Sequence, residues 1–337
     1  MNSPIPVAVV GTGHMGRHHV RVYHEMPETQ LVGIVDANLD KAKELGEKFQ
    51  TPFYDSIEPL LGKVKAVSVA VPTVAHLEVA RPFIEAGVAV LIEKPLAPDS
   101  ETARLLHRLA REKNVLLQVG HTERFNPVVR SLHAMNVMPK FVETHRISPF
   151  TFRSADIGVV MDMMIHDIDV VLSLVRARPI RVEAVGVRVL ARHEDVANAW
   201  VTFDNGCVAN LTASRLALKT ERKIRVFSEE AYLSLDYQRK AGIAIKKDAN
   251  LDLLKLAQEI DAKDLSQMAG VDFGKMVNVE PLQVDDVEPL RAELQSFIQA
   301  LTSGGRPEVS AEDGVAAVEL AEKIVAALKC HQWELSS

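Results

Sequence analysis

The stretch IPVAVVGTGHMG, residues 5–16, predicts how the first part of the chain folds. An apolar, β-branched run leads directly into a Gly-x-Gly-x-x-Gly spacing, in which a strand turns tightly into a helix and the backbone approaches a pyrophosphate. Free amides at the N-terminus of that helix favour the negative charge. The segment therefore predicts a dinucleotide site formed by Gly11, Gly13, His14, Met15 and Gly16.

An acidic residue stands where such a site holds a ribose. Asp36 ends the next strand candidate, LVGIVD, 20 residues after Gly16. A carboxylate there accepts hydrogen bonds from a ribose 2′-hydroxyl and repels a 2′-phosphate. We expect NAD as the cofactor, in preference to NADP. The alternative is that Asp36 is an ordinary turn residue.

Three histidines on the helix that follows Gly13 raise the question of a metal. His14 and His18 are one helical turn apart, and His19 is adjacent. No third ligand of cysteine or carboxylate type lies near them in the sequence, and we expect no metal site.

The first 120 residues alternate apolar runs with helical patterns, which is typical of parallel strands joined by crossover helices. The strand candidates are residues 5–11, 31–36, 66–71, 88–93 and 114–120, and the helical patterns are residues 36–49, 73–87 and 99–113. We predict an α/β fold with a Rossmann domain over residues 1–121.

The pattern changes after residue 121, and we predict a second domain over residues 122–337. Its sheet is expected to be open and mostly antiparallel, because consecutive strand-like segments are separated by turn signals. The helical segments are 124–135, 158–175, 287–304 and 310–329, and the strand-like segments are 180–190, 200–205, 207–214, 223–228 and 231–237. Residues 246–285 are expected to form a helix and a loop, and the C-terminal helix to pack back on the first domain.

Composition excludes several classes of function. The chain has 337 residues, a net charge of -6 and 47% hydrophobic residues, so we expect neither nucleic-acid nor membrane binding. Its two cysteines, Cys207 and Cys330, cannot build a disulfide framework. We expect a cytoplasmic protein.

A lysine follows the strand candidate 88–93 at its carboxyl end, where ligands bind in open α/β sheets. Pro95 fixes the backbone of this Glu93-Lys94-Pro95 motif. The Lys94 ammonium could hydrogen-bond a reacting hydroxyl or, with a lowered pKa, accept its proton. The alternative is a solvated loop.

The chain resembles the Gfo/Idh/MocA oxidoreductase family over nearly its whole length. The resemblance rests on the glycine segment, on Glu93-Lys94-Pro95, and on Val71-Pro72-Thr73 followed by His76. It implies that Lys94 lies beside nicotinamide and substrate, and that the other residues of these motifs line the cofactor site. It also implies a homodimer or homotetramer that pairs through the outer face of the second sheet.

The family's second signature is an Asp-x-x-x-His on a helix, and Asp162 and His166 match it. Their spacing places them on one helix face, where Asp169 and Ser173 continue a narrow polar stripe. Such a stripe either faces water or lines the substrate cleft, and the lysine motif favours the cleft. The resemblance implies that Asp162 orients the substrate while His166 or Lys94 removes the hydroxyl proton.

Two further segments are expected to line the cleft. The resemblance implies this for Glu123–Pro127, which contains Arg124 and Asn126, and residues 145–154 contribute Arg146 and Arg153. Arginine forks suit phosphate or carboxylate oxygens. The alternative for the arginines is surface ion pairing.

These segments, with residues 158–169 and 203–215, resemble the branch of the family that oxidises the 3-hydroxyl of UDP-N-acetylglucosamine. The implied product is a 3-keto sugar nucleotide, ready for an aminotransferase partner in the synthesis of a lipid A precursor. One alternative is a free sugar or inositol dehydrogenase, and another is a biliverdin reductase-like enzyme. An alternative from another class is a non-catalytic dinucleotide-binding sensor.

Overall fold

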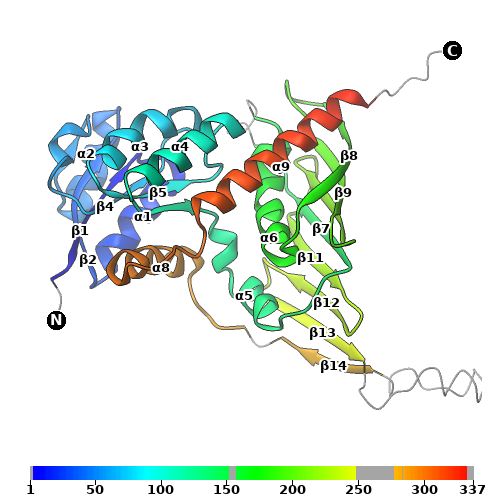
Figure 1. The fold of residues 1–337 in the computed structure, drawn as a ribbon. Helices are drawn as coiled ribbons and strands as arrows, with labels where there is room; N and C mark the ends of the chain where they lie inside the picture. The colour runs from blue at the N-terminus through cyan, green and yellow to red at the C-terminus, as the bar shows by residue number, and fades with distance from the viewer. Residues whose placement is uncertain (1–2, 152–156, 248–276, 283, 332–337) are drawn as a thin grey trace, which may run out of the picture.

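The computed structural model describes residues 3–151, 157–247, 277–282 and 284–331. They form a six-stranded sheet and an eight-stranded sheet, each covered by helices (Figure 1). This arrangement confirms the predicted fold class, a Rossmann sheet followed by a mostly antiparallel sheet. The division of the chain at residue 121 stays a prediction, because helices from the C-terminal part contact both sheets.

The six-stranded sheet is parallel throughout, in the order β3-β2-β1-β4-β5-β6. Its strands are β1 (Ile5–Val10), β2 (Thr29–Val35), β3 (Phe53–Tyr54), β4 (Ala66–Val69), β5 (Ala89–Glu93) and β6 (Leu117–Gly120). The strand order reverses between β1 and β4, and ligands bind at the carboxyl ends of strands at such a point. The glycine segment and the Glu93-Lys94-Pro95 motif both follow strands at this edge.

Helices cover both faces of this sheet, which is why its strands are continuous apolar runs. The helices are α1 (His14–Glu25), α2 (Leu39–Phe49), α3 (His76–Glu85) and α4 (Ser100–Glu112). A fifth helix, α8 (Pro289–Ser303), comes from near the end of the chain. Its Leu294 and Phe297 join a core cluster with Val7 of β1 and Val20 of α1, so the first layer is completed by a distant segment (Figure 1).

The eight-stranded sheet has the order β14-β13-β12-β11-β7-β10-β9-β8. Among its described strands, only β7 and β10 pair in parallel, and the other neighbours are antiparallel. The strands are β7 (Phe141–Ile147), β8 (Pro179–Val187), β9 (Val196–Phe203), β10 (Val208–Ser214), β11 (Glu221–Phe227), β12 (Ala231–Asp236), β13 (Ala241–Lys247) and β14 (Val277–Pro281).

Two parts of this sheet differ from the sequence-based expectation. Strand β7 was not predicted, because four of its seven residues are polar or charged. The expected helix and loop over 246–285 is wrong at both ends, where β13 and β14 pair. Pairing with a neighbouring strand outweighs weak local preference at such positions. Residues 248–276 lie outside the described part of the chain.

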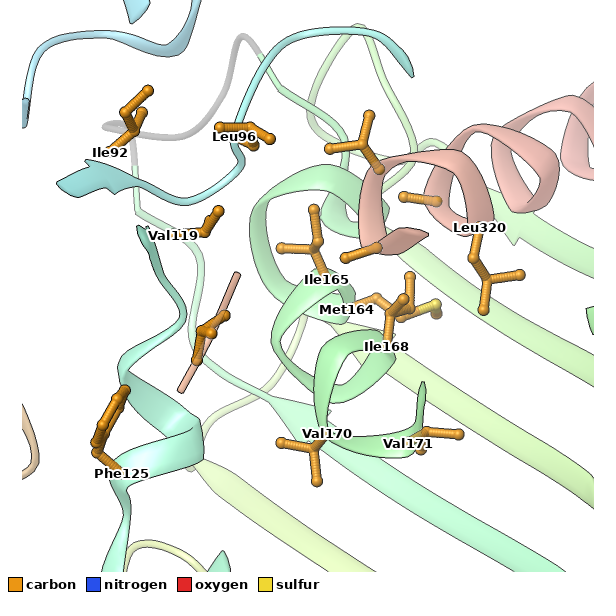
Figure 2. Packing of buried hydrophobic residues seen from close by; sticks show 14 of the residues in the cluster. Ile92, Leu96, Val119, Phe125, Met164, Ile165, Ile168, Val170, Val171 and Leu320 are labelled. Carbon is orange, nitrogen blue, oxygen red and sulfur yellow. The ribbon is translucent and has the colours of Figure 1, made fainter. Parts of the chain in front are cut away.

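The core is continuous between the two sheets, and α6 (Ile165–Val175) lies at its centre (Figure 2). The helices α5 (Pro127–Ala134) and α9 (Ala311–Cys330) lie on the same side of the second sheet as α6 (Figure 1). Ile165 and Ile168 of α6 share one cluster of buried side chains with Ile92, Val119 and Leu320. This packing fixes α6 relative to the end of β5, where Lys94 follows.

Helix α9 joins the two halves of the molecule. It begins with a capping box in which Ser310 and Asp313 exchange hydrogen bonds, and it contacts α4, α6 and β8. Within the described residues, no helix is long and apolar enough to cross a membrane.

Candidate active site

The three glycines of the first turn have different surroundings. Gly11 has a φ of +92°, and a Cβ there would lie 2.5 Å from the carbonyl oxygen of Ala70. A Cβ on Gly16 would lie 1.8 Å from the carbonyl oxygen of Gly11. A Cβ on Gly13 would meet nothing within 4 Å. Gly11 and Gly16 are therefore required by the turn itself, whereas Gly13 borders open space.

The N-terminus of α1 fits the pyrophosphate of a dinucleotide. Gly13 is the N-cap residue and makes no side-chain capping hydrogen bond. The backbone amides of the first turn, which include those of His14 and Met15, have no acceptor within the helix itself and lie at the end of α1 that favours negative charge. The rings of His14 and His18 pack edge to face, with centroids 5.2 Å apart.

Asp36 is held as an anion beside this turn. Its Oδ2 accepts hydrogen bonds from the Thr12 amide at 2.8 Å and the Thr12 hydroxyl at 2.6 Å, and its Oδ1 accepts one from the Asn38 amide at 2.9 Å. Burial opposes ionisation, but these hydrogen bonds outweigh it and lower the pKa of Asp36. A carboxylate has about four lone-pair sites, so one remains for a ribose hydroxyl.

Val71, Pro72 and Thr73 follow β4 beside the glycine turn, and His76 begins α3. The His76 ring is buried between two carbonyl groups, with Nδ1 3.2 Å from Leu96 O and Nε2 3.1 Å from Val71 O. Burial lowers the pKa of His76. His76 thus links the loops after β4 and β5, and direct contact of these four residues with the cofactor stays a prediction.

Glu93 links the Glu93-Lys94-Pro95 motif to helix α1. Its Oε1 lies 2.9 Å from His19 Nε2, and its Oε2 accepts a hydrogen bond from the Lys94 amide at 3.2 Å. Burial alone would raise the pKa of Glu93, but His19 lowers it overall. The Lys94–Pro95 peptide bond is cis. The hydrogen bond from the amide of its own neighbour, Lys94, holds the Glu93 carboxylate beside that lysine at the end of β5.

Lys94, Asp162 and His166 meet in one cavity of about 200 Å³ between the two sheets. The Lys94 ammonium donates a hydrogen bond of 2.8 Å to the Asp162 backbone carbonyl and lies 3.4 Å from Asp162 Oδ1. The Lys94 side chain is 18% exposed, so a ligand can reach it. His166 lines the same cavity, and its buried Nδ1 has no hydrogen-bond partner within the described chain.

The electrostatics of this group suit proton transfer. Burial lowers the pKa of Lys94, although the charge of Asp162 opposes the shift. Burial and then the charge of Lys94 lower the pKa of His166 well below 6.5. At neutral pH the cavity is therefore lined by an uncharged imidazole beside a lysine, an arrangement that can accept and redistribute a hydroxyl proton.

The polar stripe predicted on one helix face is divided in the structure. Asp162 lies in a π-helical turn, Val160–Met164, that precedes α6, and such turns are frequent at functional sites. Asp169 faces Arg124 instead of the cavity, and the Ser173 hydroxyl lies 3.1 Å from His133 Nε2. Only the first two residues of the stripe line the cavity, because the last two are held by other helices.

The predicted substrate residues around Arg124 do not line this cavity. Arg124 forms a two-pronged ion pair with Asp169, at 2.8 and 3.1 Å. Asn126 caps α5, where its side chain accepts a hydrogen bond from the Val128 amide. These polar groups are already used inside the fold, and direct contact of Arg124 and Asn126 with the substrate stays a prediction.

Arg146 does line the cavity, but its guanidinium is fully engaged. It pairs with Asp167 at 2.8 and 2.9 Å and with Glu123 at 2.8 Å. Burial alone would lower the pKa of Arg146, but these carboxylates raise it. Arg153 lies outside the described residues.

Several residues of the cavity were missed by the sequence analysis. The structure adds Ser148, Pro149, Thr151, Met163, Arg215 and Arg222 to its lining. Arg222 stands in a strand with alternating buried positions at Ile224 and Val226. That alternation could have placed Arg222 on the inner face of the sheet, but nothing local shows that this end of the strand borders the cavity.

Known families match both halves of the chain. Residues 5–121 match a model described as an oxidoreductase family with an NAD-binding Rossmann fold, and residues 129–234 match the Gfo/Idh/MocA C-terminal domain. The chain belongs to the Gfo/Idh/MocA oxidoreductase family. It is an oxidoreductase with a Rossmann fold for a nicotinamide dinucleotide, and we set the sensor alternative aside.

Similar proteins act on sugars and polyols by name. The chain is 39% identical over 269 residues to the UDP-N-acetylglucosamine 3-dehydrogenase of Acidithiobacillus ferrooxidans, which covers 75% of this chain and 85% of that protein. It is 24% identical to the inositol 2-dehydrogenase of Rhizobium meliloti, with 94% of each covered.

Solved structures agree with this assignment. A structure of the Acidithiobacillus ferrooxidans enzyme superposes with a TM-score of 0.86 at 32% identity, covering 97% of this chain and 98% of that one. A levoglucosan dehydrogenase in complex with NADH and levoglucosan has a TM-score of 0.80, covering 97% and 98%. At 18% identity, that second likeness shows the fold alone.

Proposed function

We propose that this enzyme oxidises the 3-hydroxyl of UDP-N-acetylglucosamine to a 3-keto sugar nucleotide, with NAD as the acceptor. The observation that carries the proposal is the cavity where Lys94, Asp162 and His166 meet at the carboxyl end of β5. The similarity to a named UDP-N-acetylglucosamine 3-dehydrogenase over 85% of its length supports this substrate.

Each of the three residues has a distinct task in this proposal. The Lys94 ammonium donates a hydrogen bond to the reacting hydroxyl and stabilises negative charge on its oxygen. The neutral imidazole of His166 receives the proton, or Lys94 receives it in its uncharged form. Asp162 holds the ammonium in place at 3.4 Å. The bound nicotinamide supplies the hydride acceptor.

The first turn and Asp36 support NAD as the preferred cofactor. The carboxylate of Asp36 is stabilised as an anion by Thr12 and Asn38, and a fixed negative charge repels a ribose 2′-phosphate. Replacement of Asp36 by Ser should therefore lower the preference for NAD over NADP, measured as the ratio of the two kcat/KM values.

The test of the substrate uses purified enzyme with NAD, UDP-N-acetylglucosamine and a carbonyl trap. Absorbance of NADH and the mass of the trapped product are measured together. A trapped 3-keto product that is absent with Lys94→Ala and His166→Ala supports the proposal. If NAD binds but no product forms, this substrate is wrong.

A free sugar or inositol dehydrogenase is the second candidate. One observation favours it: Arg146, one of the two arginines expected to hold phosphate, is occupied by buried carboxylates, and the other, Arg153, lies outside the described residues. The same assay with N-acetylglucosamine and myo-inositol decides between the candidates.

The assembly proposed here is a homodimer or homotetramer that pairs through the outer face of the second sheet. Phe141, Trp200, Phe227 and Tyr232 form a chain of ring contacts on neighbouring strands, with centroids 4.8 to 5.7 Å apart. Trp200 and Phe227 are exposed and the other two rings are half-buried, and a continuous group of such aromatic side chains suits a protein interface. A cytoplasmic location and an aminotransferase that uses the keto product belong to the same proposal.

A further inference from the structure

The cavity that holds Lys94 and His166 is too small for a whole sugar nucleotide. Its volume is about 200 Å³, whereas ligand pockets usually measure about 300–1,000 Å³. A single sugar ring can occupy it, and any larger substituent must extend past its mouth. The groups at that mouth therefore decide which substituents are accepted.

Four cations line the cavity, and three of them have acidic partners. Lys94 contacts Asp162, as described above. Arg146 is neutralised by Asp167 and Glu123. Arg215 donates a hydrogen bond of 2.6 Å to Asp195 and another of 2.8 Å to the carbonyl of Ile157. These three cations are held in place, and their charge is compensated.

Arg222 is different from the other three. Within the described part of the chain, its side chain makes no hydrogen bond and no ion pair, and it is exposed. It lies directly opposite Arg146 in the pairing of β11 with β7. Like charges placed opposite each other across two strands are unfavourable. The carboxylates of Glu123 and Asp167 form their ion pairs with Arg146, and they act on Arg222 only through longer-range attraction.

The strand geometry directs Arg222 toward the cavity. Directly opposed residues of antiparallel strands point to the same face, and Arg146 points inward to Asp167 of α6. After burial and nearer cations, Arg222 is also among the charges that lower the pKa of His166. Arg222 is thus within electrostatic reach of the reacting group while remaining open to solvent.

We propose that Arg222 binds the phosphates of a nucleoside diphosphate sugar at the mouth of the cavity and so selects sugar nucleotides over free sugars. The inference deepens the proposed function and rests on it for the identity of the sugar. A guanidinium without an acidic partner matches phosphate oxygens in a bidentate manner. Arg222 then binds the diphosphate, while Lys94, Asp162 and His166 contact the sugar ring.

The experiment measures UDP binding by calorimetry in the presence of saturating NAD, which keeps UDP out of the dinucleotide site. Arg222→Gln should weaken UDP binding about 10-fold to 100-fold, the range for loss of a charge-assisted hydrogen bond. Uridine, which lacks phosphate, should bind Arg222→Gln and wild type alike. With UDP-N-acetylglucosamine as substrate, Arg222→Gln should raise KM more than it lowers kcat.

The matched control is Arg225→Gln. Arg225 lies three residues further along β11, on the opposite face, and pairs with Glu143 at 2.8 Å. This variant should bind UDP as wild type does. The inference is overturned if wild type does not bind UDP, if Arg222→Gln binds it unchanged, or if Arg225→Gln weakens it equally.

The same measurements separate this inference from the proposed function. If Arg222 is required for UDP binding but UDP-N-acetylglucosamine is not oxidised, the phosphate site stands and the proposed substrate is wrong. If UDP-N-acetylglucosamine is oxidised but Arg222→Gln binds UDP as wild type does, the proposed substrate is correct and this inference is wrong.

Discussion

The cavity and the layer of ion pairs around it contain the same kinds of residues but are built in opposite ways. In the cavity, His166 Nδ1 has no partner among the described residues, and the Lys94 ammonium contacts one acidic residue. In the surrounding layer, Arg124 and Arg146 each bind a carboxylate with two hydrogen bonds.

This comparison of the cavity with the surrounding ion pairs shows which charges are available to a ligand. A buried ion pair with complete hydrogen bonding holds the fold together, and removing one partner leaves the other charge buried and uncompensated. A buried polar group that lacks hydrogen-bond partners lowers stability. Such a group is retained where a bound ligand supplies the missing hydrogen bonds. Activity and stability should therefore separate between the two regions.

Lys94→Met should have the largest effect on activity. It removes the hydrogen-bond donor and the positive charge at the reacting oxygen, and we expect oxidation to slow at least about a thousandfold. Folding should change little. The variant removes a largely buried charge, and the one carboxylate that it contacted, on Asp162, is 28% exposed. Activity assays and thermal unfolding check both parts. A large drop in melting temperature would contradict the proposed separation of activity from stability.

Arg146→Met should have the largest effect on stability. The change leaves Asp167 and Glu123 without their buried cation, which costs about 3–5 kcal/mol. Urea unfolding monitored by circular dichroism measures it, with Arg225→Met as the control for an arginine that is 35% exposed. If both variants lose equally little, the layer around the cavity is not the structural element described here.

Gly13→Ala extends the contrast to the dinucleotide turn. Because its Cβ would meet no protein atom within 4 Å, we expect normal folding. We also expect about tenfold weaker NAD binding, since the methyl group occupies the approach to the pyrophosphate. Gly16→Ala, whose Cβ would collide with Gly11, should instead fold poorly. Calorimetry and melting temperatures of both variants test this, and equal NAD binding by Gly13→Ala and wild type contradicts it.

Glu293 on α8 offers the smallest and most graded test. Burial, and then the charge of Glu93, raise the pKa of Glu293 well above 4.5, while the Thr122 hydroxyl donates a hydrogen bond of 2.8 Å to its Oε2. The folded protein therefore binds a proton that the unfolded chain releases above its lower pKa. Folding becomes less favourable as pH rises, by at most about 1.4 kcal/mol per pH unit.

Glu293→Gln keeps the shape and the acceptor for Thr122 but does not titrate. The free energy of unfolding of Glu293→Gln, compared with that of wild type, should therefore be higher at pH 8 than at pH 5. Urea unfolding at the two pH values measures this, with the exposed Glu47→Gln on α2 as a control. A gain that is the same at both values would show that Glu293 is ionised in the folded protein.

Prediction from the sequence succeeded where the chemistry is local. The glycine turn, Asp36 and Glu93-Lys94-Pro95 each lie at the end of a strand whose apolar run is visible, so their position at one sheet edge follows from the topology. It failed at β7 and β14, where pairing with neighbouring strands overrides polar or short sequences.

The Rossmann half and the family could be read from the amino-acid sequence alone, because each depends on motifs whose residues lie within a few positions of one another. The meeting of Lys94 with the Asp-x-x-x-His motif, 68 residues further along the chain, was expected only from the family resemblance. Only the tertiary structure decided which arginines are free. The partners of Arg146 and Arg124 lie 21 and 45 residues away, and such pairing follows from the packing of α6 against β7 and the loop after β6. Arg222 has no such partner among the described residues, which its local sequence does not reveal.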